Sequence, residues 1–237
     1  MGSAVVMRRI RQWKHLALLI ALIVVEILEP LAAHWRERTQ ILGGIIATLI
    51  NIAVLLVVFE RRWVRSLAFF LVALIFAATL LHEVLSDRSQ AGVIAFHSLA
   101  TVYLAFAVAI ILKRIFQQKS MGIDDVIGAL CGYILAGGAW GNIYGLVYLI
   151  WPASFRITDA VASQLGNWHL QRFFFDYFSM LTLTTGGYSD IAPAGWPVYS
   201  LVLFESVFGQ FYIAVVVAQI VSLRLAQAIK PDPSDAQ

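Results

Sequence analysis

The chain has 237 residues, of which 60% are hydrophobic and only 13% are charged. A soluble domain is about 45–50% apolar and about 25% charged, so a globule of this size cannot hide this much apolar surface behind a polar exterior. The single cysteine, Cys131, excludes an internal disulfide framework. We therefore expect an all-α integral membrane protein.

Six apolar runs are long enough to cross a bilayer, because about 20 apolar residues in a helix span a hydrocarbon core about 30 Å thick. They cover residues 13–30, 41–59, 63–81, 91–112, 126–151 and 196–223. A seventh run, 173–183, is too short to span and is typical of a re-entrant or interfacial segment.

Basic residues predict the orientation of these spans. Twelve of the 17 Lys and Arg residues lie at ends and in loops on one side, which leaves five on the other. Because basic loops stay in the cytoplasm, we expect both termini there, in a multi-pass protein of the cell (plasma or inner) membrane surrounded by its lipids. The positive charge follows this pattern and forms no basic–aromatic groove, so we expect no nucleic-acid partner.

The first run has two interpretations. Its basic start, its short apolar core and the residues Leu31-Ala32-Ala33 resemble a cleavable signal peptide. However, Glu26 and Glu29 broaden the run where a cleavage site would have to be well defined, which favours a retained span. Either outcome leaves the other spans in the same orientation.

The sequence divides into two regions and a tail. Residues 1–116 hold four spans joined by short loops, whereas residues 117–226 hold two spans separated by a long segment, 152–195. Loops of that length are usually functional or disordered, and the aromatic content of this one argues against disorder. Residues 227–237 are too few to fold, so we expect no soluble ligand-binding domain.

A Gly- and Thr-rich stretch follows a short predicted helix over residues 170–183. It reads Thr182-Leu-Thr-Thr-Gly-Gly-Tyr-Ser-Asp190. Non-helical backbone at membrane depth is tolerated only where it is buried in protein or lines a water-filled path. Glycine allows the alternating backbone angles that aim successive carbonyls into such a path, where they replace the water shell of a cation.

This stretch resembles the potassium-channel signature T-x-x-T-x-G-Y-G-D. Its flanks, among them Gly132-Tyr133, Ile150-Trp-Pro152 and Glu205-Ser-Val-Phe-Gly209, resemble the smaller prokaryotic members of that superfamily. The resemblance covers residues 124–226, and the first four spans match only in number. It implies a homotetramer with a re-entrant pore helix and a selectivity filter between the fifth and sixth spans, and no cofactor besides potassium ions in the filter.

The resemblance also implies roles for individual residues. The ion-binding filter would comprise Thr184, Thr185, Gly186, Gly187, Tyr188 and Ser189, with potassium held at the middle four. Filter support would come from Asp190, Tyr177, Phe178 and Glu205, with the Tyr188 ring against Tyr177 and Phe178 of neighbouring pore helices. An inner-helix hinge and cavity lining would comprise Gly209, Gln210, Ile213 and Val217.

Two positions depart from the family pattern. Gly186 stands where a branched residue is usual, and Ser189 stands where the second glycine is expected. A non-glycine residue at positive φ costs about 1 kcal/mol, and the missing side chain at Gly186 leaves the filter unbraced from behind. The departures predict a softer filter. The alternatives are therefore a weakly selective or non-selective cation channel, or a non-conducting membrane protein with a relic filter.

Other features narrow the function. The fourth run contains no Arg or Lys, so it cannot act as an arginine-rich voltage sensor, and we expect the first four spans to form a scaffold beside their own pore subunit. Glu205, deep in the sixth span, either buttresses the pore helix or adds negative potential, and the structural role is favoured. Without G-x-S-x-G or H-E-x-x-H, we expect no enzyme and no catalytic residue.

Overall fold

The computed structural model describes residues 14–34, 51–59, 61–84, 90–118, 122–188 and 190–228. The first predicted run forms α2 (Lys14–His34), whereas only the end of the second is described, as a helix over residues 51–58. Ser189 lies outside the described residues, as does the tail from 229 onward. Within the described part, the fold is all-α apart from one two-stranded sheet, which the sequence did not predict.

Four of the described helices are long and apolar enough to cross a membrane. They are α4 (Arg62–Val84), α5 (Gln90–Gln117), α6 (Ile123–Ile150) and α9 (Trp196–Ala228). Each contains most of a predicted span, and α5 and α6, at 28 residues, extend for about 42 Å. The chain is thus a helical, multi-pass membrane protein.

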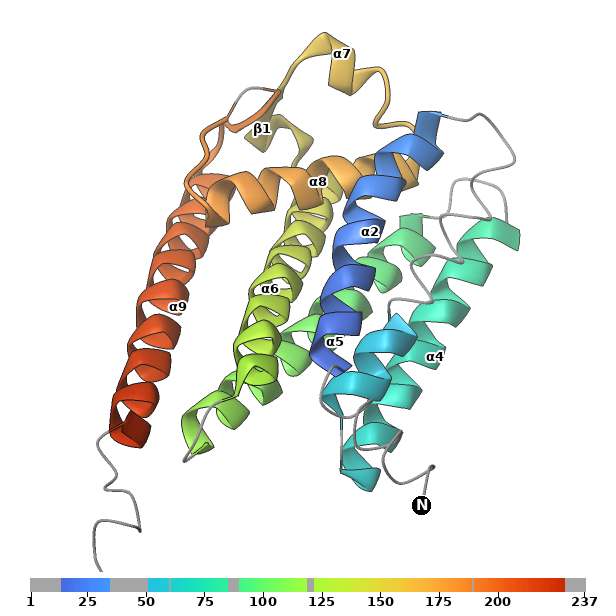
Figure 1. Ribbon diagram of the computed structural model, residues 1–237. Coiled ribbons are helices and arrows are strands. Elements are labelled where there is room, and N and C mark those ends of the chain that lie inside the picture. Colours follow the sequence, from blue (N-terminus) through green and yellow to red (C-terminus); the bar gives the residue numbers. More distant parts are fainter. Residues whose placement is uncertain are drawn as a thin grey trace, which may run out of the picture.

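The helices alternate in direction along the chain, as Figure 1 shows. Helices α2, α4 and α6 begin at the end of the molecule where α5 and α9 finish. This arrangement gathers basic residues at one end, which we call the basic end: Lys14, Arg61, Arg62, Arg65, Lys113 and Arg114. The segment between α6 and α9 lies at the opposite end.

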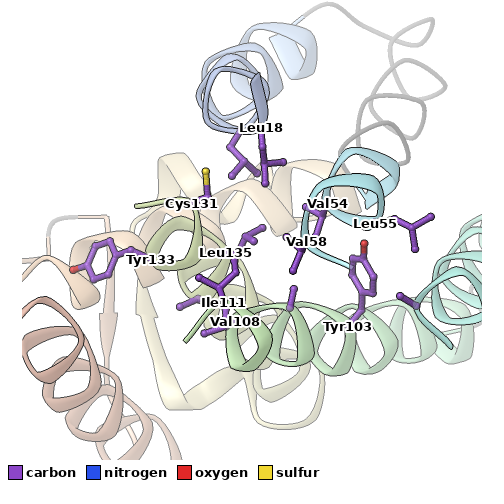
Figure 2. Close-up of a cluster of buried hydrophobic side chains, with 14 of the residues drawn as sticks. Leu18, Val54, Leu55, Val58, Tyr103, Val108, Ile111, Cys131, Tyr133 and Leu135 are labelled. Carbon is purple, nitrogen blue, oxygen red and sulfur yellow. The ribbon is translucent and has the colours of Figure 1, made fainter. Parts of the chain in front are cut away.

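The main core lies between α2, the 51–58 helix, α5 and α6. Figure 2 shows Leu18, Val54, Ile111 and Cys131 from these four helices, and all four side chains are buried. The Tyr103 hydroxyl donates to the Asn51 carbonyl oxygen at 2.6 Å and so ties α5 to the 51–58 helix. Helices α2 and α5 both pack on α6, and the expected place of the N-terminal spans beside their own pore subunit stays a prediction.

The segment between α6 and α9 folds back across the helix ends. It comprises a 3₁₀ turn η1 (Pro152–Ser154), β1 (Phe155–Ile157), α7 (Asp159–Ala162), α8 (Trp168–Leu183) and β2 (Ile191–Pro193). Helix α8 confirms the short helix predicted here, and Figure 1 shows it lying across the ends of α6 and α9. Strands β1 and β2 pair antiparallel, with Arg156 opposite Ala192.

Two glycines allow α8 to cross α6 closely. A Cβ atom at Gly141 would lie 2.8 Å from Cα of Asp176, and one at Gly137 would collide with the sulfur of Met180. At Gly141 the close atom is backbone, so only glycine fits there, whereas at Gly137 the flexible Met180 side chain would have to move. The expectation that small residues of the fifth span permit close helix approach is confirmed at this crossing.

Candidate functional site

The predicted filter begins as the C-terminal cap of α8. The Thr185 N–H donates to the Thr182 carbonyl at 3.1 Å, and the Gly186 N–H donates to the Leu181 carbonyl at 2.7 Å. These two bonds form a Schellman motif, whose residue after the cap adopts a left-handed conformation and is usually glycine. Here it is Thr185, with φ of 57°, although this conformation costs a β-branched residue about 1 kcal/mol or more.

The sign of φ then alternates along the backbone. After Thr185, φ is not positive at Gly186 but returns to 86° at Gly187. Residues 184–188 are all exposed in the single chain. Gly186 therefore does not need glycine for its backbone angles, and a Cβ atom there would meet only the flexible tip of Leu181 closely, at 3.0 Å.

The two threonine hydroxyls at the start of the filter donate to backbone oxygens. Thr184 donates to the Met180 carbonyl at 2.6 Å, and Thr185 donates to the Thr184 carbonyl at 2.7 Å. Each hydroxyl oxygen keeps its lone pairs as acceptors. The carbonyl of Thr184 is thereby engaged within the chain, whereas the proposed ion ligands begin with Thr185.

The Tyr188 side chain packs on its own helix. Its ring stacks on that of Phe178, with centroids 5.1 Å apart, and its hydroxyl lies 3.1 Å from the Thr182 hydroxyl. Because Thr182 donates its single proton to the Phe178 carbonyl, Tyr188 is the donor in this pair. Burial raises the pKa of the Tyr188 hydroxyl above its ordinary value.

The Tyr188 ring contacts Phe178 of the same chain, because the turn at Thr185 that ends α8 folds the following residues back over the helix. Tyr177 stacks on Phe173, with centroids 6.5 Å apart. The contact of Tyr188 with Tyr177 and Phe178 of neighbouring pore helices, which the resemblance implies, stays a prediction, because the structure describes one chain.

The C-terminal end of the predicted filter is anchored through its backbone. The Asp190 carbonyl accepts a hydrogen bond from the Thr158 N–H at 3.0 Å. The pairing of β2 with β1 continues this attachment immediately after Asp190. The loop that follows α6 therefore holds the far side of the filter.

Immediately before the predicted filter, the Leu183 carbonyl oxygen lies in contact with both α6 and α9. The Tyr133 hydroxyl of α6 donates to it at 2.8 Å. A Cβ atom at Gly209 of α9 would lie 2.5 Å from the same oxygen. Gly209 is thus required for close approach, and its role as a hinge remains a prediction, since α9 is helical through this position.

The remaining predicted residues of α9 share one face. At about 100° per residue, Gln210, Ile213 and Val217 lie about 80–140° around the helix from Glu205. All three are exposed in the single chain, whereas Glu205 is completely buried. Their place as cavity lining remains a prediction.

Glu205 joins α9 to α6 and α8. The Tyr144 hydroxyl donates to Oε2 of Glu205 at 2.6 Å, and the Ser179 hydroxyl lies within hydrogen-bond distance of Oε1. The same Ser179 hydroxyl lies 2.8 Å from the Gly137 carbonyl oxygen. A serine has one proton for these two acceptors, so both bonds form together only if Glu205 is protonated and donates to Ser179.

Sequence reasoning missed Tyr133, Tyr144 and Ser179 as parts of this site. The available signal was their polarity within apolar segments, since polar groups at membrane depth need partners. Polarity indicates that these residues need hydrogen-bond partners but does not say which ones. The partners of Tyr144 and Tyr133 lie 61 and 50 residues away in the sequence.

Comparisons with family models, curated proteins and solved structures find no match to this chain. Within the described residues, no group of three His, Cys, Asp or Glu side chains forms a metal-ligand cluster. The functional interpretation therefore depends on the signature and on the geometry of residues 182–190.

Proposed function

We propose that four copies of this chain assemble around a central axis as a potassium-channel-like channel that conducts monovalent cations passively. Six spans per chain would surround a re-entrant pore helix, α8, and a filter made of residues 184–189. The four N-terminal spans would serve as a scaffold without an arginine-rich voltage sensor. Both termini would lie in the cytoplasm.

One observation carries the proposal, namely an exposed backbone segment at the end of the half-buried helix α8, in which the sign of φ alternates from residue to residue. Thr185 and Gly187 have positive φ, with Gly186 between them, and all three are exposed while both ends of the segment are anchored. Alternating angles turn successive carbonyls toward one side, which is the arrangement that can replace a cation's water shell. One chain supplies only one side of such a path, so closure requires further copies around an axis.

The C-terminus of helix α8 would also attract a cation electrostatically. Its 16 residues end at the filter, and a helix C-terminus carries a partial negative charge of about half an electron. The carbonyls of its last turn are engaged by Gly186, Thr185 and Tyr133, so the end is held in place without a cationic side chain. Four such ends around an axis would favour a cation there.

The filter sequence favours weak selectivity within this proposal. Gly186 brings no side chain to brace the filter. The missing brace would leave the carbonyl spacing less rigid, and a rigid spacing is one account of potassium-over-sodium discrimination.

Flux from proteoliposomes tests the proposal. The full chain is reconstituted with potassium inside, and a potential-sensitive dye reports current under potassium or sodium gradients. We expect flux of both ions, with potassium preferred, and block by barium. Equal flux would identify a non-selective pore, whereas no flux from a verified tetramer would contradict conduction and favour the relic filter.

A matched pair of variants ties the flux to the filter. Gly187→Ala places a side chain at φ of 86° and should abolish flux, whereas Gly166→Ala, where a Cβ atom meets nothing within 4 Å, should leave it unchanged. Both variants add the same methyl group to the same loop region. Equal flux from the two would show that ions do not pass residues 184–188.

A further inference from the structure

A groove of about 570 Å³ opens at the basic end, away from the proposed filter. It lies between the end of the 51–58 helix, the start of α4 and the last half of α5. Its apolar floor includes Val58, Phe106 and Ile110. Phe59, which is fully buried, stacks on Phe106 with ring centroids 5.4 Å apart, so packed core side chains form the floor.

The groove follows α5 over a length that matches the thickness of one leaflet. Its lining on α5 recurs every three or four residues from Phe106 to Gln117, which makes one continuous helix stripe. Eleven residues of helix rise about 16 Å, and half of a hydrocarbon core is about 15 Å. The dimensions are those of an extended acyl chain rather than of a small soluble molecule.

The mouth of the groove is basic. Arg61 and Lys113 line it and are exposed, and Arg114 lines it while also lying 3.8 Å from an Asp125 carboxylate oxygen. None of the described residues that line the groove is acidic. Trp63, whose side chain is 69% exposed, lies at the same mouth, and tryptophan favours the headgroup level of a bilayer.

We propose that this groove binds one anionic phospholipid, with its phosphate between Arg61 and Lys113 and one acyl chain along α5. Basic mouths between membrane helices bind anionic headgroups, and a guanidinium and an ammonium together match a phosphate. A zwitterionic lipid offers the same phosphate but brings a cationic choline close to the two basic side chains, and a soluble anion would leave the apolar floor empty. The inference goes beyond the proposed channel function and requires only that the basic end face a leaflet.

Native mass spectrometry of the full chain in neutral detergent tests this inference. The protein is titrated with dioleoyl phosphatidylglycerol or with dioleoyl phosphatidylcholine, which differ in headgroup but share acyl chains. We expect phosphatidylglycerol to bind at least tenfold more tightly. Arg61→Gln with Lys113→Gln should weaken it about 30-fold, since each basic residue near a surface contributes about fivefold.

Three controls make the test decisive. Lys14→Gln with Arg62→Gln removes the same charge from the same end outside the groove, so it should change binding less than twofold. Ala109→Trp fills the groove without changing its charge and should weaken binding at least tenfold, whereas Ala105→Trp, on an exposed part of α5 outside the lining, should not. Thermal melting in neutral detergent verifies that each variant is folded.

Several results would overturn the inference. They are equal affinity for the two lipids, equal loss in the groove and control variants, and displacement of the lipid by an equal concentration of glycerol 3-phosphate. The last result would identify a site for soluble phosphate. Because no ion flux is measured, failure here is distinct from failure of the channel proposal.

Discussion

Replacing Glu205 by glutamine and by alanine would test whether this buried side chain is a neutral carboxyl. In the wild type, Tyr144 donates to Oε2. If the Ser179 hydroxyl donates to the Gly137 carbonyl, Oε1 of Glu205 must carry a proton to bond to Ser179. Glutamine offers the same pair, because its oxygen can accept from Tyr144 and its amide can donate to Ser179. We therefore expect Glu205→Gln to change the free energy of unfolding by less than about 1 kcal/mol.

Replacement by alanine removes the hydrogen bonds of Glu205 to Tyr144 and to Ser179 together. The fully buried Tyr144 hydroxyl would lose its acceptor, which costs about 1–3 kcal/mol, and the cavity left by the truncated side chain adds a similar amount. We expect Glu205→Ala to lower the free energy of unfolding by about 3–5 kcal/mol. Gln210→Ala, on the exposed face of the same helix, should change it by less than about 0.5 kcal/mol.

The assay is denaturant unfolding of the purified protein in detergent, followed by far-ultraviolet circular dichroism. If Glu205→Gln loses as much stability as Glu205→Ala, the site requires a negative charge and the proton count is wrong. If Glu205→Ala loses less than about 1 kcal/mol, the hydrogen bonds contribute little and the buttress is not structural.

Three further predictions concern backbone positions near the filter. Gly141→Ala should lower the free energy of unfolding by about 1–3 kcal/mol, because the added methyl group would clash with the Asp176 backbone. Gly166→Ala, in open space, should leave it unchanged, and equal effects of the two variants would contradict the close crossing of α6 and α8. Thr185→Gly should raise the same free energy by up to about 1 kcal/mol by relieving the positive φ, and a decrease would show that the cap is not strained. Gly186→Val with Ser189→Gly should increase the potassium-to-sodium flux ratio, and an unchanged ratio and conductance would refute the softened filter.

Hydropathy alone located the long helices. The runs at 63–81, 91–112, 126–151 and 196–223 coincide with α4, α5, α6 and α9, because a lipid-facing helix must be apolar over its whole length. The observed helices extend past the runs by up to five residues at one end, where polar residues continue the helix beyond the hydrocarbon. The short helix before the filter was also predicted, to within two residues.

Contacts between residues far apart in the sequence could not be predicted. Strands β1 and β2 have three residues each, too few to show an alternating pattern, and they pair across 36 residues. Positive φ was expected at Ser189, by analogy with a family glycine, and this residue lies outside the described ones; within the described segment, Thr185 and Gly187 have positive φ. A β-branched residue is a poor local signal for that conformation, and only the hydrogen bonds of the cap identify it.

The meeting of three helices at the Leu183 carbonyl has a mechanical consequence. Tyr133 of α6 donates a hydrogen bond to this atom, and Gly209 lets α9 approach the same atom closely. A tilt of α9 that widens the basic end would therefore either turn about this contact or displace the last turn of α8. In the second case the displacement would pass directly to Thr185, two residues further on, so movement of α9 and the conformation of residues 184–188 would be coupled without any separate sensor.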